Sequence, residues 1–265
     1  MARGLPWVDR LEAVYEIKGG LILTVHTHRC DLTAVNLLGS FALRCNGERF
    51  ALPPGTQRLV AFLAFQRGSV KRGYVAGMLW TRYSQDAANA NLRSALWRLN
   101  RLPFRVVDST STHLSLAAEV VVDYRETIGI ARRIRGDAAA CDSRALESVM
   151  LAGELLPDWY DDWVVIERES FRQARLHALE TACDALIGAA RYASAIELGL
   201  AAVASEPLRE TAHRAVMRAH LAEGNRAEAL RQYDCAGGRS GRLACGPRPR
   251  PTASGIVATR SRPNR

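Results

Sequence analysis

The amino-acid sequence predicts a mainly helical protein with a small β content, divided into two domains. The first observation is an amphipathic segment, residues 86–102, that separates apolar side chains from arginines. The second is a short motif in the second half of the chain, residues 191–196, that returns at residues 225–230. The third is a change of net charge, from +6 over residues 35–123 (11 basic, 5 acidic) to −4 over residues 124–234 (14 basic, 18 acidic). A basic domain next to an acidic domain is expected if the basic domain binds the phosphates of nucleic acid and the acidic domain binds protein.

Two strands and two helices are expected before the amphipathic segment. Residues 35–45 alternate apolar and polar side chains, which predicts a strand, and Asn46-Gly47 then favours a tight hairpin turn into residues 49–52. Apolar residues at helical spacing predict helices over residues 56–67 and 69–80. The first domain is therefore expected to begin with a small antiparallel sheet and two helices.

Residues 86–102 predict a third helix with two different faces. At about 100° per residue its apolar side chains form a continuous stripe with i, i+3, i+4 spacing. The stripe consists of Ala88, Leu92, Ala95, Leu96 and Leu99. The opposite face carries Ala90, Ser94, Trp97 and Arg101, flanked by Arg93 and Arg98. Nucleic acid is the partner that best suits three guanidinium groups and an aromatic ring on one face.

A second hairpin is expected directly after this helix. Pro103 ends the helix, and residues 104–107 and 114–116 predict two strands joined by a polar tip at residues 108–112. A strand pair, three helices and a terminal hairpin in this order make a winged helix-turn-helix. In that fold the last helix enters the major groove of DNA, and the hairpin, or wing, touches the backbone or the minor groove.

The second half of the chain predicts helices that repeat. Helices are expected over residues 124–135 and 143–151, followed by a long amphipathic stretch over residues 164–190. Residues 191–196 and 225–230 align at the tetratricopeptide period of about 34 residues. The sequence therefore predicts an all-α, tetratricopeptide-like domain that binds proteins or peptides, with an ordinary helical bundle as the alternative.

The match to the tetratricopeptide pattern is partial. With Ala195 as the small residue where the two helices of a unit cross, Pro207 lies where that unit ends. In the next unit Ala229 is followed four residues later by the aromatic Tyr233, whereas Gly199 replaces the aromatic in the first unit. Neither unit has the usual early tryptophan.

Several motifs together resemble one bacterial family. They are residues 37–43 (LLGSFAL), 58–64 (RLVAFLA), 79–80 (LW), 91–99 (NLRSALWRL), 155–163 (LLPDWYDDW) and the run 191–233. On these residues the chain resembles the Streptomyces antibiotic regulatory protein family of transcriptional activators, over residues 35–234. The resemblance implies an OmpR-type winged helix, a bacterial transcriptional activator domain, binding of paired protomers to promoter direct repeats, and recruitment of RNA polymerase.

The resemblance also implies which residues contact DNA. The candidates are Arg93, Ser94, Trp97, Arg98 and Arg101 in the third helix, Lys71 and Arg72 at the start of the second helix, and Arg105 and Thr112 in the wing. Structural alternatives stay open for the third helix. Arg93 and Arg98 can instead pair with Asp86 and Asp108, and Trp97 can pack under the wing. His113 in the wing suits a solvated role better than a functional one.

Both ends of the chain depart from this pattern. The expected parts are an N-terminal extension (1–34), the DNA-binding domain (35–123), the activator domain (124–234) and a disordered tail (235–265). The tail holds seven arginines, four prolines and no acidic residue, so it cannot build a core. The second repeat requires more helix in this region, so we expect that the reading frame is shifted after about Asp234. The alternative is that the tail is a basic arm that binds DNA.

The N-terminal extension contains His26, His28 and Cys30 at alternate positions of a predicted strand. No fourth ligand accompanies them, so no metal site is expected. An equal alternative is that the start site is placed too far upstream.

Composition and motifs exclude several classes of function. No apolar run approaches the roughly 20 residues that span a bilayer, and the N-terminus lacks a secretory pattern, so we expect a cytoplasmic protein. The sequence lacks a glycine-rich phosphate-binding loop, so no ATPase domain is expected. Residues 158–163 are acidic and aromatic, and aspartates that cap a helix with tryptophans that pack explain them better than the paired carboxylates of a hydrolase do. Six scattered cysteines without a CxxC pair favour buried thiols.

The expected function is sequence-specific DNA binding by a transcriptional regulator without enzymatic activity or a cofactor. Its expected partners are double-stranded promoter DNA, RNA polymerase and a second copy of the chain. The alternative is a protein-interaction adaptor, or a truncated non-activating copy, whose helical repeats bind protein without DNA recognition.

Overall fold

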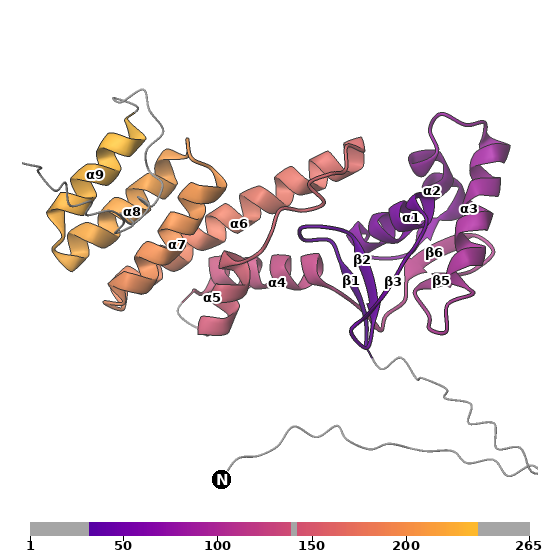
Figure 1. The fold of residues 1–265 in the computed structure, drawn as a ribbon, viewed down its shortest axis with the longest axis horizontal. Coiled ribbons are helices and arrows are strands. Elements are labelled where there is room, and N and C mark those ends of the chain that lie inside the picture. The colour runs from indigo at the N-terminus through magenta and orange to yellow at the C-terminus, as the bar shows by residue number, and fades with distance from the viewer. Residues whose placement is uncertain (1–31, 139–141, 238–265) are drawn as a thin grey trace, which may run out of the picture. The chain divides into compact units, whose positions relative to one another are not determined.

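The computed structural model describes residues 32–138 and 142–237, which form two compact units that divide after Arg125 (Figure 1). The described part of the first unit combines two small sheets with three helices, and that of the second is helical. This confirms the expected fold class, a mainly α protein in which a winged helix precedes an all-α domain.

The first unit begins with a four-stranded sheet in the order β3-β2-β1-β7. β1 (Thr33–Asn36), β2 (Ala42–Cys45) and β3 (Glu48–Phe50) are antiparallel neighbours. β7 (Val120–Val122) returns from the far end of the unit and pairs in parallel with β1. The sheet therefore ties the start of this unit to its end.

The single strand expected over residues 35–45 is wrong. The chain reverses within this stretch at Gly39, whose φ of +89° favours glycine, and places Val35 opposite Leu43 in the β1–β2 pair. The apolar and polar alternation continues through the reversal, so it gave no sign of the turn. Asn46 and Gly47, both at positive φ, form the expected turn between β2 and β3.

Three helices follow the opening strands. They are α1 (Pro54–Phe65), α2 (Arg72–Leu79) and α3 (Gln85–Leu99). Proline is favoured at the first position of α1, where no helical N–H is needed, and the helix begins two residues earlier than expected. Ser84 caps α3 by accepting a hydrogen bond from the backbone N–H of Ala87.

The wing is a three-stranded sheet in the order β4-β6-β5. β4 (Val70–Lys71) pairs with β6 (His113–Leu116), which pairs with β5 (Val107–Ser109). β4 takes two of the residues expected in the second helix, which therefore begins at Arg72. The strand expected over residues 104–107 begins only at Val107, because the Phe104 ring instead packs edge-on against Phe50, with centroids 4.8 Å apart.

Two side chains at the end of the first unit hold its elements together. The Asp123 carboxylate accepts backbone N–H bonds from Leu37 at 2.8 Å and from Tyr124 at 2.7 Å. The Arg125 guanidinium donates to the carbonyl oxygens of Leu63 and Ala64, which lie in the last turn of α1. Burial lowers the pKa of Arg125. These bonds satisfy polar groups at the end of β1 and the end of α1 that have no partner in their own element.

The second unit is built from six helices in its described residues. They are α4 (Asp123–Gly136), which carries the chain into this unit, α5 (Ser143–Met150), α6 (Asp162–Gly188), α7 (Tyr192–Ser205), α8 (Glu210–Glu223) and α9 (Arg226–Ala236). α6, α7, α8 and α9 pack each against the next along the chain (Figure 1). Their core is rich in alanine, with Leu176, Leu179, Ala195, Ala202 and Ala215 among its buried members.

The offset between the two sequence motifs corresponds to equivalent helices. α7 begins at Tyr192 and α9 at Arg226, so the C-terminal half of α6 with α7 forms one helical pair, and α8 with α9 forms the next. Ala195 is fully buried, as expected for a helix crossing. A Cβ on Gly199 would lie 2.7 Å from Val216 Cγ2 of α8, so the close approach of α7 to α8 explains why glycine stands where the aromatic residue is usual.

The acidic and aromatic segment before α6 has a structural role. Arg168 donates to the carbonyl oxygens of Leu155, Leu156 and Trp159, and the rings of Trp159 and Trp163 pack edge-on. The packing of the tryptophans agrees with expectation. Asp161 occupies the N-cap position of α6 but makes no side-chain capping hydrogen bond there, so the capping explanation is wrong in that respect.

The cysteines differ from expectation at two positions. Cys183 is a buried free thiol, but Cys235 is exposed and Cys45 is disulfide-bonded. Distance in the sequence does not fix distance in space, so scattered positions were a poor guide to disulfide bonding. Burial raises the pKa of the Cys183 thiol to about 11, which keeps it protonated.

Some expectations fall on residues that the structure does not describe. These are His26, His28 and Cys30 in the extension, and the tail from residue 238 onward. α9 continues to Ala236, two residues past the expected boundary at 234. Within residues 32–138 and 142–237, no helix is long and apolar enough to cross a bilayer, and no cluster of three potential metal ligands occurs.

Candidate nucleic-acid interface

The third helix of the first unit separates its two faces as expected. Ala88, Leu92, Ala95, Leu96 and Leu99 are its buried residues. They are the residues of the predicted stripe, and they anchor α3 against α1 and α2. Ser94, Trp97 and Arg98 are exposed on the other side. The packing that buries one face thereby presents the other face to solvent.

Arg93 and Arg98 are exposed and carry no hydrogen bond or ion pair to another residue in the described part of the chain. The alternative pairing with Asp108 does not occur, since Asp108 forms an ion pair with Arg105. Asp86 lies in the first turn of α3, where a carboxylate interacts favourably with the helix dipole. Both guanidinium groups therefore remain available to an external ligand.

Trp97 and Arg101 form a stacked pair on the exposed face. The Arg101 guanidinium carbon lies 4.7 Å from the centroid of the Trp97 ring, and 58% of Trp97 is exposed. Trp97 is therefore not packed under the wing. A ring held beneath a guanidinium restricts the orientations that both groups sample.

Some basic residues at the wing are hydrogen-bonded within the protein, and others are exposed to solvent. Arg72 donates from Nη1 to Ser109 Oγ at 2.7 Å and to the Thr110 carbonyl oxygen at 3.1 Å, so its guanidinium braces the wing tip. Lys71 is exposed in β4, next to Arg72.

Thr112 and Arg105 also have partners within the wing. The Thr112 hydroxyl lies 2.9 Å from His113 Nδ1, and Arg105 is held by Asp108. The structure thus places the nine candidates on α3 and the turn after it, on the start of α2 and on the wing, but leaves only part of them without an internal partner among the described residues.

Sequence reasoning missed the bracing role of Arg72. It depends on β4, a very short strand that lies far along the chain from its partner β6 and that belongs to no alternating run. The signal that remained was weak: a β-branched residue, Val70, next to two basic residues between two helices.

Comparison with known proteins addresses each half of the chain. The family model described as bacterial transcriptional activator domain matches residues 130–249. The chain is also similar in fold to Mycobacterium tuberculosis EmbR, solved in complex with a low-affinity phosphopeptide, with a TM-score of 0.60 and 19% sequence identity. That match covers 77% of this chain and 58% of the EmbR chain. No curated protein matches the chain.

The match to EmbR, at this level of identity, establishes the arrangement of the fold, and the domain match establishes the second half. The chain thus combines an N-terminal winged helix with a second half that matches the bacterial transcriptional activator domain over residues 130–249.

Proposed function

We propose that the chain binds specific promoter DNA through the exposed face of α3 and activates transcription there. The observation that carries the proposal is the pair of exposed, unpartnered guanidinium groups of Arg93 and Arg98 beside the Trp97–Arg101 stack, all within the described residues. Arginine donates two parallel hydrogen bonds to guanine O6 and N7, the commonest base-specific contact in the major groove. The buried stripe on the opposite face of α3 fixes the direction in which these groups point.

The spacing of the exposed residues suits a short DNA site. Arg93, Trp97 and Arg98 lie on α3, and Arg101 follows in the turn two residues after its end. At about 1.5 Å per residue, Arg93 and Arg98 are about 7.5 Å apart along the helix axis, roughly the rise of two base pairs. Lys71 and the wing lie outside α3, and we assign them to phosphate and backbone contacts that position the helix. Ser94 lies between Arg93 and Trp97 and suits a base edge or a phosphate.

The proposal includes two further partners. We infer that two copies of the chain bind adjacent repeats of the site, and that the second unit contributes to contact with RNA polymerase. The support for both is the match to the bacterial transcriptional activator domain over residues 130–249. A run-off transcription assay with bacterial RNA polymerase, on templates with one or two copies of the selected site, tests both inferences.

The DNA-binding proposal is tested with the full chain and a library of random duplex DNA. We expect repeated selection to enrich one short sequence. Its affinity, measured by fluorescence anisotropy, should fall steeply between about 50 and 200 mM salt as phosphate contacts are screened. Failure to enrich any sequence over random duplex would overturn the proposal and favour a protein-interaction adaptor.

A further inference from the structure

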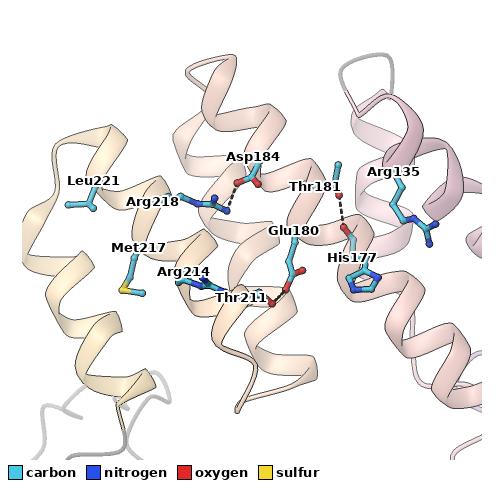
Figure 2. A pocket seen from close by; sticks show the side chains of 10 residues that line it. All are labelled: Arg135, His177, Glu180, Thr181, Asp184, Thr211, Arg214, Met217, Arg218 and Leu221. Atoms are coloured by element: carbon cyan, nitrogen blue, oxygen red, sulfur yellow. Dashed lines mark hydrogen bonds and ion pairs between the residues drawn. The ribbon is translucent and has the colours of Figure 1, made fainter.

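The second unit contains an open groove of about 1100 Å³ between α6 and α8, remote in the sequence from the DNA-binding candidates (Figure 2). Its wall on α6 is formed by His177, Glu180, Thr181 and Asp184. Its wall on α8 is formed by Thr211, Arg214, Met217, Arg218 and Leu221, and Arg135 of α4 adds a further guanidinium. Side chains of both helices point into the same space in Figure 2.

The two walls are the same positions of two successive repeats. His177 and Thr211, Glu180 and Arg214, and Asp184 and Arg218 each lie one repeat period apart, the offset that also relates Tyr192 to Arg226. The acidic pair of the first repeat is thus replaced by a basic pair in the second. Repeat architectures use the surface formed by equivalent helices for binding, and here that surface differs in charge from one helix to the next.

The carboxylates of the groove are already neutralised. Asp184 forms an ion pair with Arg218 at 2.6 Å, and Glu180 accepts from Arg209 Nε and from the Thr211 hydroxyl, both at 2.6 Å. Burial would raise the pKa of Glu180, but the hydrogen bonds from Arg209 and Thr211 lower it overall, so the carboxylate stays charged.

The remaining positive charge of the groove is not balanced. Arg135 and Arg214 are exposed and form no hydrogen bond or ion pair with any residue in the described ranges. This local excess stands out because residues 124–234 carry a net charge of −4. Beside these arginines, Met217 and Leu221 offer apolar surface, and 55% of Leu221 is exposed.

We propose that this groove binds an extended acidic segment of a partner protein, whose carboxylates pair with Arg214 and Arg135 and whose aliphatic side chain packs on Met217 and Leu221. The planar guanidinium group matches a carboxylate with two parallel hydrogen bonds. Nucleic acid is a poor occupant, because residues 124–234 carry a net charge of −4 and, of the described arginines of the groove, only Arg135 and Arg214 are left to meet phosphates. A short peptide can place one carboxylate on Arg214 of α8 and another on Arg135 of α4.

The test uses the full chain and a displayed library of random short peptides. We expect selection to enrich peptides that combine aspartate or glutamate with leucine or another aliphatic residue. The most enriched peptide is then labelled with fluorescein, and its affinity is measured by anisotropy. The double variant Arg135→Glu/Arg214→Glu should lose about tenfold or more in affinity, since each lost charge-assisted hydrogen bond is worth roughly that factor.

Two controls separate this groove from other basic surfaces. Arg191→Glu makes the same charge change at an exposed position outside the groove and should leave peptide affinity unchanged. Arg98→Ala, on the proposed DNA-binding face, should also leave it unchanged, so failure of DNA binding and failure of peptide binding remain distinguishable. Circular dichroism confirms that each variant is folded.

Enrichment of basic or uncharged peptides, or no enrichment at all, would overturn the proposal. The same holds if the double variant binds the acidic peptide as tightly as the unaltered chain, or if Arg98→Ala abolishes peptide binding, because either result places the peptide elsewhere.

Discussion

The arginines of the two units are used in opposite ways. On α3 of the first unit, Arg93 and Arg98 are exposed and bonded to nothing in the described residues. In the second unit Arg168 and Arg175 are half-buried, and their guanidinium groups donate to backbone carbonyl oxygens. The same side chain is thus left available to an external ligand in one unit and completes the fold in the other.

The difference shows why charge counts alone are a weak guide to function. The second unit has more arginines than the first, yet several of them satisfy carbonyl groups that have no partner in their own helix. Arg175, for example, reaches the Val149 and Met150 carbonyl oxygens at the end of α5 and the Ser205 hydroxyl at the end of α7. What separates a ligand-binding arginine from a structural one is the absence or presence of internal acceptors.

The largest effect is expected from Arg175→Met, which keeps the length of the side chain but removes its donors. The Val149 and Met150 carbonyl groups lose the Arg175 donor, and the Ser205 hydroxyl keeps only its bond to the Ala201 carbonyl oxygen, so we expect the free energy of unfolding to fall by about 2–3 kcal/mol. Urea unfolding followed by circular dichroism measures this change. Arg191→Met, at an exposed position, should change stability by less than about 0.5 kcal/mol. Equal stability of the two variants would contradict the structural role of Arg175.

The converse change is Arg98→Ala, which should weaken binding to the selected DNA site by about 1–3 kcal/mol while leaving unfolding unaffected. Anisotropy measurements with the selected site and with random duplex separate two roles. A loss confined to the selected site identifies a base contact. An equal loss on both would reassign Arg98 to phosphate. If Arg98→Ala instead lowers the free energy of unfolding, Arg98 has a structural role, and the distinction between the arginines of the two units does not hold.

How far the sequence could predict these roles depends on whether each feature is local. The buried stripe of α3 follows from helical periodicity between Ala88 and Leu99, and all of its members were predicted. The exposed position of Trp97 was left open, since it depends on where the wing packs. Gly199 was noticed as a departure from the repeat, but its reason, the approach of Val216, required the packing of α7 on α8.

Features that join distant segments could not be predicted. The parallel pairing of β7 with β1 places Val122 beside Val35, from opposite ends of the first unit, and the short β4 gives no periodic signal of its own. The groove between α6 and α8 was equally hidden, although the repeat offset that relates its walls is visible in the sequence. Aligning the two repeats position by position would have paired Glu180 with Arg214 and shown the reversal of charge.

A smaller effect is expected from Trp97→Ala, which removes the ring beneath Arg101. The guanidinium then samples more orientations, so DNA affinity should fall by about 0.5–1 kcal/mol, the range of an exposed cation–π contact. Trp97→Phe keeps an aromatic face and should recover part of the loss. Affinity of both variants is measured by anisotropy at constant salt. If Phe and Ala behave alike, the ring acts on DNA through contacts other than the stack with Arg101.

The smallest effect is expected on the pH dependence of stability at Glu169, whose solvent-exposed carboxylate pairs with Arg172 in the second unit. Arg172 donates two hydrogen bonds of 2.9 Å to Glu169 and Gln173 adds a third, which lowers the pKa of Glu169 to about 2. Because this pKa lies below the value of 4.5 for a free side chain, the stabilisation is complete above about pH 4.5 and is lost as the pH falls toward 2.

With 55% of the Glu169 side chain exposed, solvent screening limits the contribution of this cluster to about 0.5 kcal/mol. Carboxyl NMR titration should show the low pKa of Glu169, and Arg172→Ala should return it toward 4.5. Glu169→Gln should remove this part of the acid sensitivity without changing stability at pH 7 by more than a few tenths of a kcal/mol. If Glu169 titrates at its ordinary pKa in the unaltered chain, the cluster does not persist in solution. Arg172 would then be held by Glu206 alone.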